Sequence, residues 1–154
     1  MILRLTVLLI LTSNASLAND RVTVIDGDTI KYGTTRIRLK EIDAPELGQE
    51  CKNKTTGFTF DCGEKSKKTL LQLMQSRSIR CKYDARDDKY GRKLGTCFAG
   101  ELNLNAAMIS KGWAVTPDGY PSQYRLLEYG AKEAGRGIWE TIFIHPREWR
   151  KFKK

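Results

Sequence analysis

The chain has 154 residues, and 27 lysines and arginines against 18 aspartates and glutamates give it a net charge of +9. This length fits one domain with one hydrophobic core, and no internal repeat, low-complexity tract or flexible linker divides it. The positive charge favours capture of polyanions but does not identify them, because cationic exported proteins also bind membranes and cell-wall polymers.

The first eighteen residues predict a secretory signal peptide. Arg4 precedes an apolar run from Leu5 to Thr12, and Ser16-Leu17-Ala18 supplies the small residues of a cleavage site. The run is far shorter than the ~20 residues of a membrane span, and an uncleaved anchor is the alternative. Cleavage after Ala18 leaves residues 19–154 as a single domain with a net charge of +8. We expect an exported monomer, secreted or periplasmic, without membrane attachment.

Two strands are predicted next. The first runs from Val22 to Ile30 and the second from Thr35 to Ile42. In the second, Ile37 and Leu39 alternate with the cations Arg36, Arg38 and Lys40. Side chains alternate across a strand, so the three cations project from one face. For Arg36 and Lys40 we favour a solvated strand face.

Helices and further strands follow. Asp61-Cys62-Gly63-Glu64 has the spacing of a capping box, which predicts a helix over 62–76. Strands over 78–83 and 93–98 flank a turn at 88–92. A second helix over 104–111 ends at Gly112, and a third runs from 121–122 to about 135. The elements alone indicate a mixed α+β fold.

Four cysteines lie in the exported part, at Cys51, Cys62, Cys81 and Cys97. An even number in an oxidising compartment suggests two disulfides, with three possible connectivities. Local pairing, Cys51–Cys62 and Cys81–Cys97, is favoured by the positions, because the second pair flanks the predicted turn. Zinc binding is the rival interpretation, but no Cys-x2-Cys pair occurs and His145 is the only histidine.

Two carboxylate–arginine clusters carry the chemistry. The first is Asp26-Gly27-Asp28-Thr29 followed by Arg38-Leu39-Lys40-Glu41-Ile42-Asp43-Ala44-Pro45-Glu46, and the second is Asp88-Lys89-Tyr90-Gly91-Arg92. Hydrolysis of a phosphodiester needs a cation held by carboxylates, a base to activate water, and fixed positive charge for the phosphate oxygens. The two clusters contain all three.

In order and spacing, these motifs and the tail around Arg136-Gly137-Ile138-Trp139 resemble the staphylococcal nuclease (thermonuclease) family. The resemblance covers most of the chain after residue 20. It implies a small five-stranded β-barrel of the OB type with about three helices. It also implies an enzyme that hydrolyses DNA and RNA at the 5′ P–O bond, leaving 3′-phosphates. Because the positive charge and the arginines address phosphates, we expect flexible single strands to be preferred over rigid duplex.

The resemblance assigns roles to individual residues. It implies that Asp28, Asp43 and the main-chain carbonyl of Ala44 hold Ca²⁺, with Asp26 shaping the turn. Position 44 commonly holds threonine in the best-known relative, and alanine is tolerable because the main chain is the ligand. Glu46 accepts a proton from the attacking water or orients it, and Arg38 and Arg92 hold the phosphate. Lys89 and Tyr90 match positions that contact a nucleotide's terminal phosphate.

Base stacking is less well defined. The family places stacking tyrosines after Gly112, but this chain departs from that pattern with Trp113 and Tyr120. Both are candidates for stacking on bases, with core packing as the alternative. Trp139 and Trp149 are expected to pack, and the basic segment 147–154 is expected to be a partly mobile tail.

Other interpretations stay open at this stage. Taken singly, Asp28 and Asp43 could be turn residues, Glu46 a surface acid, and Arg92 a hairpin cation. A non-catalytic nucleic-acid-binding OB module and a cationic protein acting on envelopes or partner proteins are the competing functions. A single histidine argues against mechanisms that use a histidine pair or a histidine–metal cluster.

Overall fold

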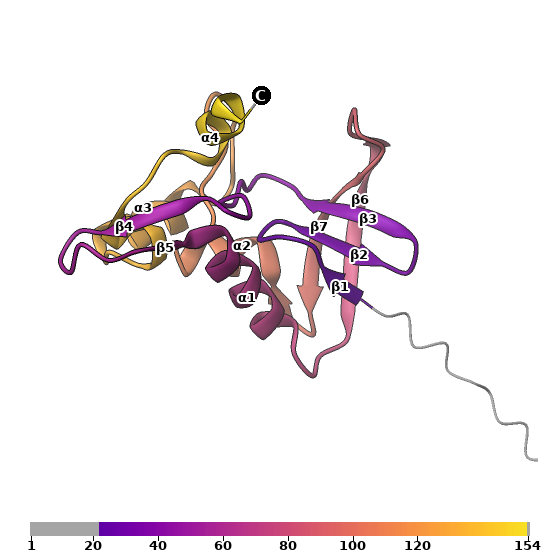
Figure 1. Ribbon diagram of the computed structural model, residues 1–154. Helices are drawn as coiled ribbons and strands as arrows, with labels where there is room; N and C mark the ends of the chain where they lie inside the picture. Colours follow the sequence, from indigo (N-terminus) through magenta and orange to yellow (C-terminus); the bar gives the residue numbers. More distant parts are fainter. Residues whose placement is uncertain (1–21, 154) are drawn as a thin grey trace, which may run out of the picture.

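The computed structural model describes residues 22–153. The predicted signal peptide, residues 1–18, and Lys154 at the end of the tail lie outside the described residues. Figure 1 shows a curved sheet with α1, α2 and α3 gathered on one side and α4 apart from them. No helix within 22–153 is long and apolar enough to cross a membrane.

One mixed sheet follows the strand order β1-β2-β3-β7-β6, and β8 pairs with β7 beside this path. The strands are β1 (Val22–Val24), β2 (Thr29–Tyr32), β3 (Thr35–Leu39), β6 (Ile79–Asp87), β7 (Lys93–Ala99) and β8 (Leu102–Asn103). β3 and β7 are parallel, and the other pairs are antiparallel. This half-barrel with helices confirms the predicted α+β fold of the OB type.

The first predicted strand is divided in the structure. A tight turn separates β1 from β2, because the backbone N–H groups of Ile25 and Asp26 both donate to the carbonyl of Thr29. Asp26 strengthens this turn by accepting a hydrogen bond from the Asp28 N–H at 3.0 Å. Alternating apolar residues favoured one continuous strand, and the short-range hydrogen bonds of the aspartate turn overrode that pattern.

The alternation of side chains along β3 determines on which face of the sheet Arg38 lies. Ile37 and Leu39 are fully buried in the core, so the side chain of Arg38 lies on the opposite face. The parallel register pairs Arg38 with Leu94, two residues after Arg92. The sheet therefore brings together two arginines that are far apart in the sequence.

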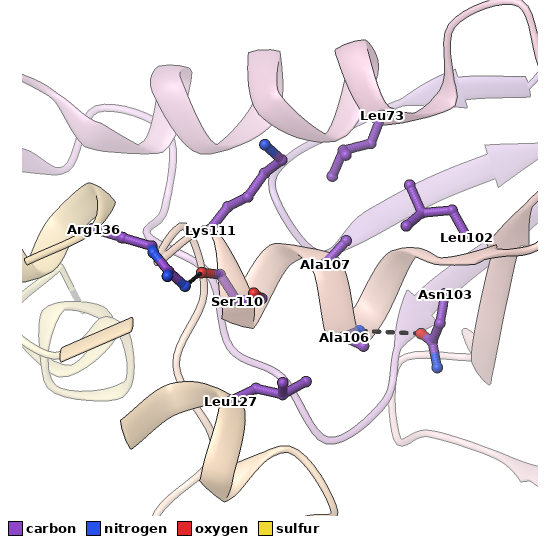
Figure 2. Close-up of a pocket in the computed structure, with 9 residues that line it drawn as sticks. All are labelled: Leu73, Leu102, Asn103, Ala106, Ala107, Ser110, Lys111, Leu127 and Arg136. Carbon is purple, nitrogen blue, oxygen red and sulfur yellow. Dashed lines mark hydrogen bonds between the residues drawn. The ribbon is translucent and has the colours of Figure 1, made fainter. Parts of the chain in front are cut away.

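Four α-helices and one 3₁₀ helix follow or interrupt the strands, and the first two α-helices begin at polar caps. They are α1 (Cys62–Met74), α2 (Leu104–Ser110), α3 (Arg125–Glu133), the 3₁₀ helix η1 (Gly137–Glu140) and α4 (Pro146–Phe152). The Asp61 side chain accepts from the Glu64 N–H at 2.8 Å, as the capping box predicts. Asn103 caps α2 in the same way through the N–H of Ala106 (Figure 2).

Two of these helices differ from the prediction. α3 begins at Arg125, because Ser122 is used to cap the preceding turn, where its hydroxyl accepts from the Tyr124 N–H at 3.2 Å. The basic tail forms α4, with Pro146 in its first turn, where the missing N–H has no helical partner to lose. The structure thus contains four α-helices within 22–153 where about three were predicted.

A second, smaller sheet has the order β5-β4-β9, and packs around its own apolar cluster. Its strands are β4 (Glu50–Asn53), β5 (Thr59–Asp61) and β9 (Thr141–Ile142). Cys51 and Cys62 form a disulfide between β4 and the start of α1. Cys81 and Cys97 form the other disulfide, across β6 and β7. The sequence separations are 11 and 16 residues, and closing loops of this size contributes about 3 kcal/mol each to stability.

The main core lies between the half-barrel and the helices. Its fully buried side chains come from the sheet and from both α1 and α2, and include Ile30, Ile37, Leu39, Leu70, Leu104, Met108 and Ile109. An apolar hollow between α1, α2 and α3 (Figure 2) lies at the outer edge of this core and is lined by Leu73, Leu102, Ala106, Ala107 and Leu127, among others.

Candidate active site

A pocket of about 540 Å³ brings the two carboxylate–arginine clusters together. It is lined by Asp26, Arg36, Arg38, Glu46, Lys89, Tyr90, Arg92 and Arg150. Five of these eight side chains are cationic, so the pocket attracts anions. Planar guanidinium groups suit the oxygens of a phosphate, which two N–H groups of one arginine can contact at once.

Two buried carboxylates lie at this pocket. Asp28 and Asp43 are each only 3% exposed. Arg38 bridges them, with Nη1 at 2.7 Å from Oδ1 of Asp28 and Nη2 at 2.7 Å from Oδ1 of Asp43. Buried charges need such partners, so Arg38 both compensates the acids and fixes their separation.

Asp28 is held by the groups around its turn. Its Oδ1 accepts from the Thr29 hydroxyl at 3.0 Å, and its Oδ2 accepts from the Ala44 N–H at 2.9 Å. Gly27 lets α1 approach closely, because a Cβ there would overlap the hydroxyl of Ser66. The glycine of the Asp-Gly-Asp motif is therefore required by packing, not by the turn.

Asp43 is held by a backbone bridge. Its N–H donates to the carbonyl of Val115 at 2.8 Å, and the Val115 N–H donates back at 2.9 Å. Val115 is fully buried, so the carboxylate is anchored to the interior of the molecule. The segment from Asp43 to Ala44 thereby lies against the β1–β2 turn.

Burial raises the pKa of Asp28 to about 7, the nearby Arg38 opposes this, and Asp26 and Asp43 raise it further. Burial acts to lower the pKa of Arg38, but Asp28 and Asp43 outweigh it and raise that pKa. Asp28, Asp43 and Arg38 thus form one electrostatically coupled group, in which a change at one member shifts the others.

Glu46 lies at the edge of the pocket with its side chain about one-third exposed. A fully buried glutamine, Gln49, holds the loop that carries it. Its Oε1 accepts from the Glu46 N–H at 3.1 Å, and its Nε2 donates to the carbonyl of Ile144 at 2.6 Å. The carboxylate of Glu46 thus lines the pocket, and the hydrogen bonds of Gln49 restrain the backbone that carries it.

Arg92 is positioned by the β6–β7 hairpin. Asp88 Oδ1 accepts from the N–H groups of Tyr90 and Arg92, both at 2.9 Å, and Gly91 adopts φ 72°. Asp88 Oδ2 lies 2.7 Å from both Nε and Nη2 of Arg92. The remaining N–H groups of Arg92 are left for an anion.

Lys89 and Tyr90 lie on the same hairpin and line the same pocket. Tyr90 is 67% exposed, and the cations of Lys89 and Arg92 lie 5.0 and 5.4 Å from the centre of its ring. Cation–π contacts at such exposed sites contribute modestly to stability. The ring therefore stays available to a ligand.

Trp113 and Tyr120 lie away from this pocket. Trp113 is partly buried between the two apolar clusters, and its carbonyl accepts from the Ser66 hydroxyl at 2.7 Å. This is the packing position that was the alternative to base stacking. Tyr120 is 69% exposed beside an adjoining hollow that Arg38 and Lys40 also line. Of the two aromatic residues, only Tyr120 shares a hollow with Arg38.

Sequence reasoning missed Arg150. Its Nη1 lies 2.7 Å from Oε1 of Glu46 and 2.9 Å from Oδ1 of Asp43, and its Nη2 lies 2.9 Å from Oδ2 of Asp43. These contacts raise the pKa of Arg150 although burial acts to lower it. Within a run of cations, only a long-range contact distinguishes one arginine from its neighbours, so no local signal marks it.

A metal ion would find few protein ligands here. Within 22–153 no group of three or more histidine, cysteine, aspartate or glutamate side chains is arranged to hold one. Asp28, Asp43 and nearby backbone carbonyls offer only oxygen, which suits a hard cation that keeps waters or binds substrate oxygens.

Comparison with known proteins defines the family. Residues 36–141 match the family described as staphylococcal nuclease homologue. A succinoglycan biosynthesis protein, ExoI, from Rhizobium meliloti is 37% identical over 86% of this chain and 72% of its own length. An uncharacterized endonuclease of Haemophilus influenzae is 31% identical over 86% of this chain and 72% of its own length. A micrococcal nuclease of Shigella flexneri is 31% identical over 91% and 84%.

The chain therefore belongs to the staphylococcal nuclease family, which confirms the resemblance drawn from its motifs. Its class is that of an endonuclease, a hydrolase of phosphodiester bonds. The family match ends at residue 141, before α4 begins, so Arg150 lies outside it.

Proposed function

We propose that this protein is an exported, Ca²⁺-dependent endonuclease that cleaves DNA and RNA with little sequence preference. The observation that carries the proposal is the convergence of Arg38, Glu46 and Arg92 on one pocket, above the buried pair Asp28 and Asp43. A solvated strand face or an ordinary hairpin would not gather these side chains.

Asp28, Asp43 and the Ala44 carbonyl would hold the cation. Bound Ca²⁺ supplies a Lewis acid that polarises a phosphoryl oxygen and neutralises part of its charge. The two carboxylates are fixed in position, since Arg38 contacts both and the Ala44 N–H donates to Asp28. The substrate phosphate and water complete the all-oxygen shell.

Glu46 would take a proton from the attacking water, or orient that water. Its partial exposure leaves it accessible to solvent, while Gln49 restricts the backbone behind it. Arg38 and Arg92 would donate N–H groups to the phosphate, where negative charge develops in the transition state. Asp88 acts behind Arg92 by holding its guanidinium.

Phosphate contacts also bear on substrate choice. Guanidinium groups and Lys89 address the nucleic-acid backbone and carry no base information. A flexible single strand can bend a phosphate into the pocket more easily than a rigid duplex, so we propose preferential cleavage of single strands. Nothing in the proposed chemistry uses or excludes a 2′-hydroxyl group.

Export is supported by the cysteines. All four are paired within the described residues, which fits an oxidising compartment. Together with the predicted signal peptide over residues 1–18, this leads us to propose secretion or a periplasmic location for residues 19–154, acting as a monomer.

Calcium dependence is the first test. We expect hydrolysis of single-stranded DNA to require Ca²⁺ and to stop in excess chelator. Without a divalent cation between them, the buried carboxylates would repel the negatively charged phosphate. Mg²⁺ should support less turnover, since it demands tighter octahedral geometry. Acid-soluble nucleotide release is the measurement. Full activity in chelator would contradict the metal assignment.

The role of Glu46 is tested by Glu46→Gln, which keeps the size of the side chain but removes the base. We expect turnover to fall by roughly 10²–10⁴-fold with little change in substrate binding. Glu50→Gln is the matched control, because Glu50 is exposed in β4 on the same segment. Equal turnover in both variants would exclude Glu46 as the base.

The competing function is a nucleic-acid-binding module without catalysis. The discriminating result is a purified wild type that binds single-stranded DNA and never cleaves it at any Ca²⁺ concentration. The full set of Asp28, Arg38, Asp43, Glu46 and Arg92 favours the enzyme, since binding alone needs none of the carboxylates.

A further inference from the structure

The guanidinium of Arg150 already occupies the carboxylate site. It contacts both oxygens of Asp43 and one oxygen of Glu46, at 2.7 to 2.9 Å. Asp43 is almost fully buried, whereas Arg150 is 39% exposed on its side chain. A partly exposed arginine from the end of the chain thus caps two acids that the proposed reaction needs.

Counting lone pairs limits what else Asp43 can bind. Its Oδ1 accepts from Nη2 of Arg38 and from Nη1 of Arg150, which uses both lone pairs of that oxygen. Its Oδ2 accepts from Nη2 of Arg150. A divalent cation at about 2.3–2.6 Å from these oxygens would displace one guanidinium or lie against its positive charge.

Of the two arginines, Arg150 is the one able to leave. Arg38 lies on a central strand and also pairs with Asp28, so its departure would leave the buried Asp28 without an ion-pair partner. Arg150 stands on α4, a helix of seven residues in which only Pro146 is buried. Within 22–153, the ion pairs of Arg150 are the polar contacts that join α4 to the site.

We propose that Arg150 is a built-in competitor of the metal ion: in the metal-free protein it neutralises Asp43 and Glu46, and Ca²⁺ binding displaces it and loosens α4. This inference rests on the proposed function, specifically on a cation held by Asp28 and Asp43. The exchange would keep the acids compensated: without Arg150, Asp43 keeps only its ion pair with Arg38 and Glu46 keeps none within 22–153, and a divalent cation would supply the missing positive charge.

The decisive measurement is Ca²⁺ affinity by titration calorimetry without nucleic acid. We expect Arg150→Ala to bind Ca²⁺ more tightly than the wild type, by roughly 5- to 150-fold, the usual range of such couplings. Arg147→Ala is the matched control, because Arg147 is exposed on the same helix and its removal changes the net charge equally. Arg150→Lys should lie between, since lysine cannot contact two acids as a fork.

A second measurement is independent of the substitutions. Hydrogen exchange of residues 146–152 in the wild type should become faster on addition of Ca²⁺, while exchange around Asp28 and Asp43 becomes slower. An arginine with a purely structural role would leave the exchange of α4 unchanged or slowed.

The outcomes separate the two proposals. If the wild type and Arg150→Ala bind Ca²⁺ equally, the competition is overturned and the calcium-dependent nuclease stands. If Arg150→Ala loses turnover without a gain in Ca²⁺ affinity, Arg150 contacts the substrate and the competition is again overturned. If no variant binds Ca²⁺, both the calcium assignment and the competition fail.

Discussion

Two arginines of the candidate active site, Arg38 and Arg92, each use some of their N–H groups to bind carboxylates of the protein itself. Arg38 holds Asp28 and Asp43, and Arg92 is held by Asp88 through Nε and Nη2. A guanidinium fixed on one edge presents its free edge in a defined direction, which a flexible lysine could not do. Each of these arginines therefore functions together with its carboxylate partner. Substituting one member of such a pair changes the position and the charge environment of the other.

The pair Asp88–Arg92 makes stability depend on pH. Partial burial acts against the charged carboxylate, but hydrogen bonds from Arg92 and Tyr90 outweigh it and lower the pKa of Asp88. Its contribution to folding is therefore complete well above the unfolded pKa of about 3.9 and is lost as the pH falls through the lower folded value. We expect the difference in unfolding free energy between the wild type and Asp88→Asn to shrink below about pH 4. Urea unfolding between pH 7 and pH 3 measures it, and a difference independent of pH would refute the argument.

At the scale of elements, local signals were sufficient where the stabilising contacts are local. The capping box located the start of α1, and the turn residues located the β6–β7 hairpin. The β1–β2 turn was missed, since apolar alternation continues through residues that fold back on Thr29. The contact between α4 and Asp43 was also missed, because it joins residues more than one hundred positions apart. Long-range contacts leave no trace in local periodicity.

The junction of α1 with the Glu46 loop provides a test at this scale. A Cβ at Gly63 would collide with the carbonyl of Glu46. We expect Gly63→Ala to lower the free energy of unfolding by about 1–3 kcal/mol, as overpacking does, and to lower turnover by shifting Glu46.

The control for Gly63→Ala is Gly130→Ala in α3, where an added Cβ meets no atom within 4 Å. It should be neutral or stabilise the helix by up to about 1 kcal/mol, with turnover unchanged. Denaturant unfolding and initial rates of cleavage measure both effects. Equal behaviour of the two variants would mean that the Glu46 loop adapts freely.

For the molecule as a whole, the charge of +9 is the dominant long-range property. It raises the encounter rate with nucleic acid and makes binding depend on released counterions. The basic pocket concentrates part of that charge at the hairpin tip and β3, while the apolar hollow of Figure 2 shares none of its lining residues. Part of the positive charge therefore lies in the same pocket as Glu46.

Salt dependence tests this distribution. With single-stranded DNA in chelator, the logarithm of the binding constant should fall linearly with the logarithm of salt concentration. Lys89→Ala should reduce the slope by about 0.7, the value for one phosphate contact on a single strand. Lys132→Ala is the control, since Lys132 pairs with Glu128 in α3, and its slope should match the wild type. A strict recognition sequence would argue against binding dominated by phosphate.

The parallel pairing of β3 with β7 has a consequence for the order in which the molecule acquires its chemistry. Ile37 pairs with Lys93, so the two clusters meet only after a loop of more than fifty residues has closed. Closing such a loop costs conformational entropy before the stabilising contacts between β3 and β7 can form. Non-local pairings of this kind therefore form late and slowly. Asp28, Arg38, Asp43 and Glu46 are synthesised first, and the hairpin that carries Arg92 and its partner Asp88 follows with β6 and β7. If Arg38, Glu46 and Arg92 act together as we propose, a chain that is still emerging or unfolded lacks the complete pocket, and nucleic acids near its place of synthesis are exposed to cleavage only once folding is complete.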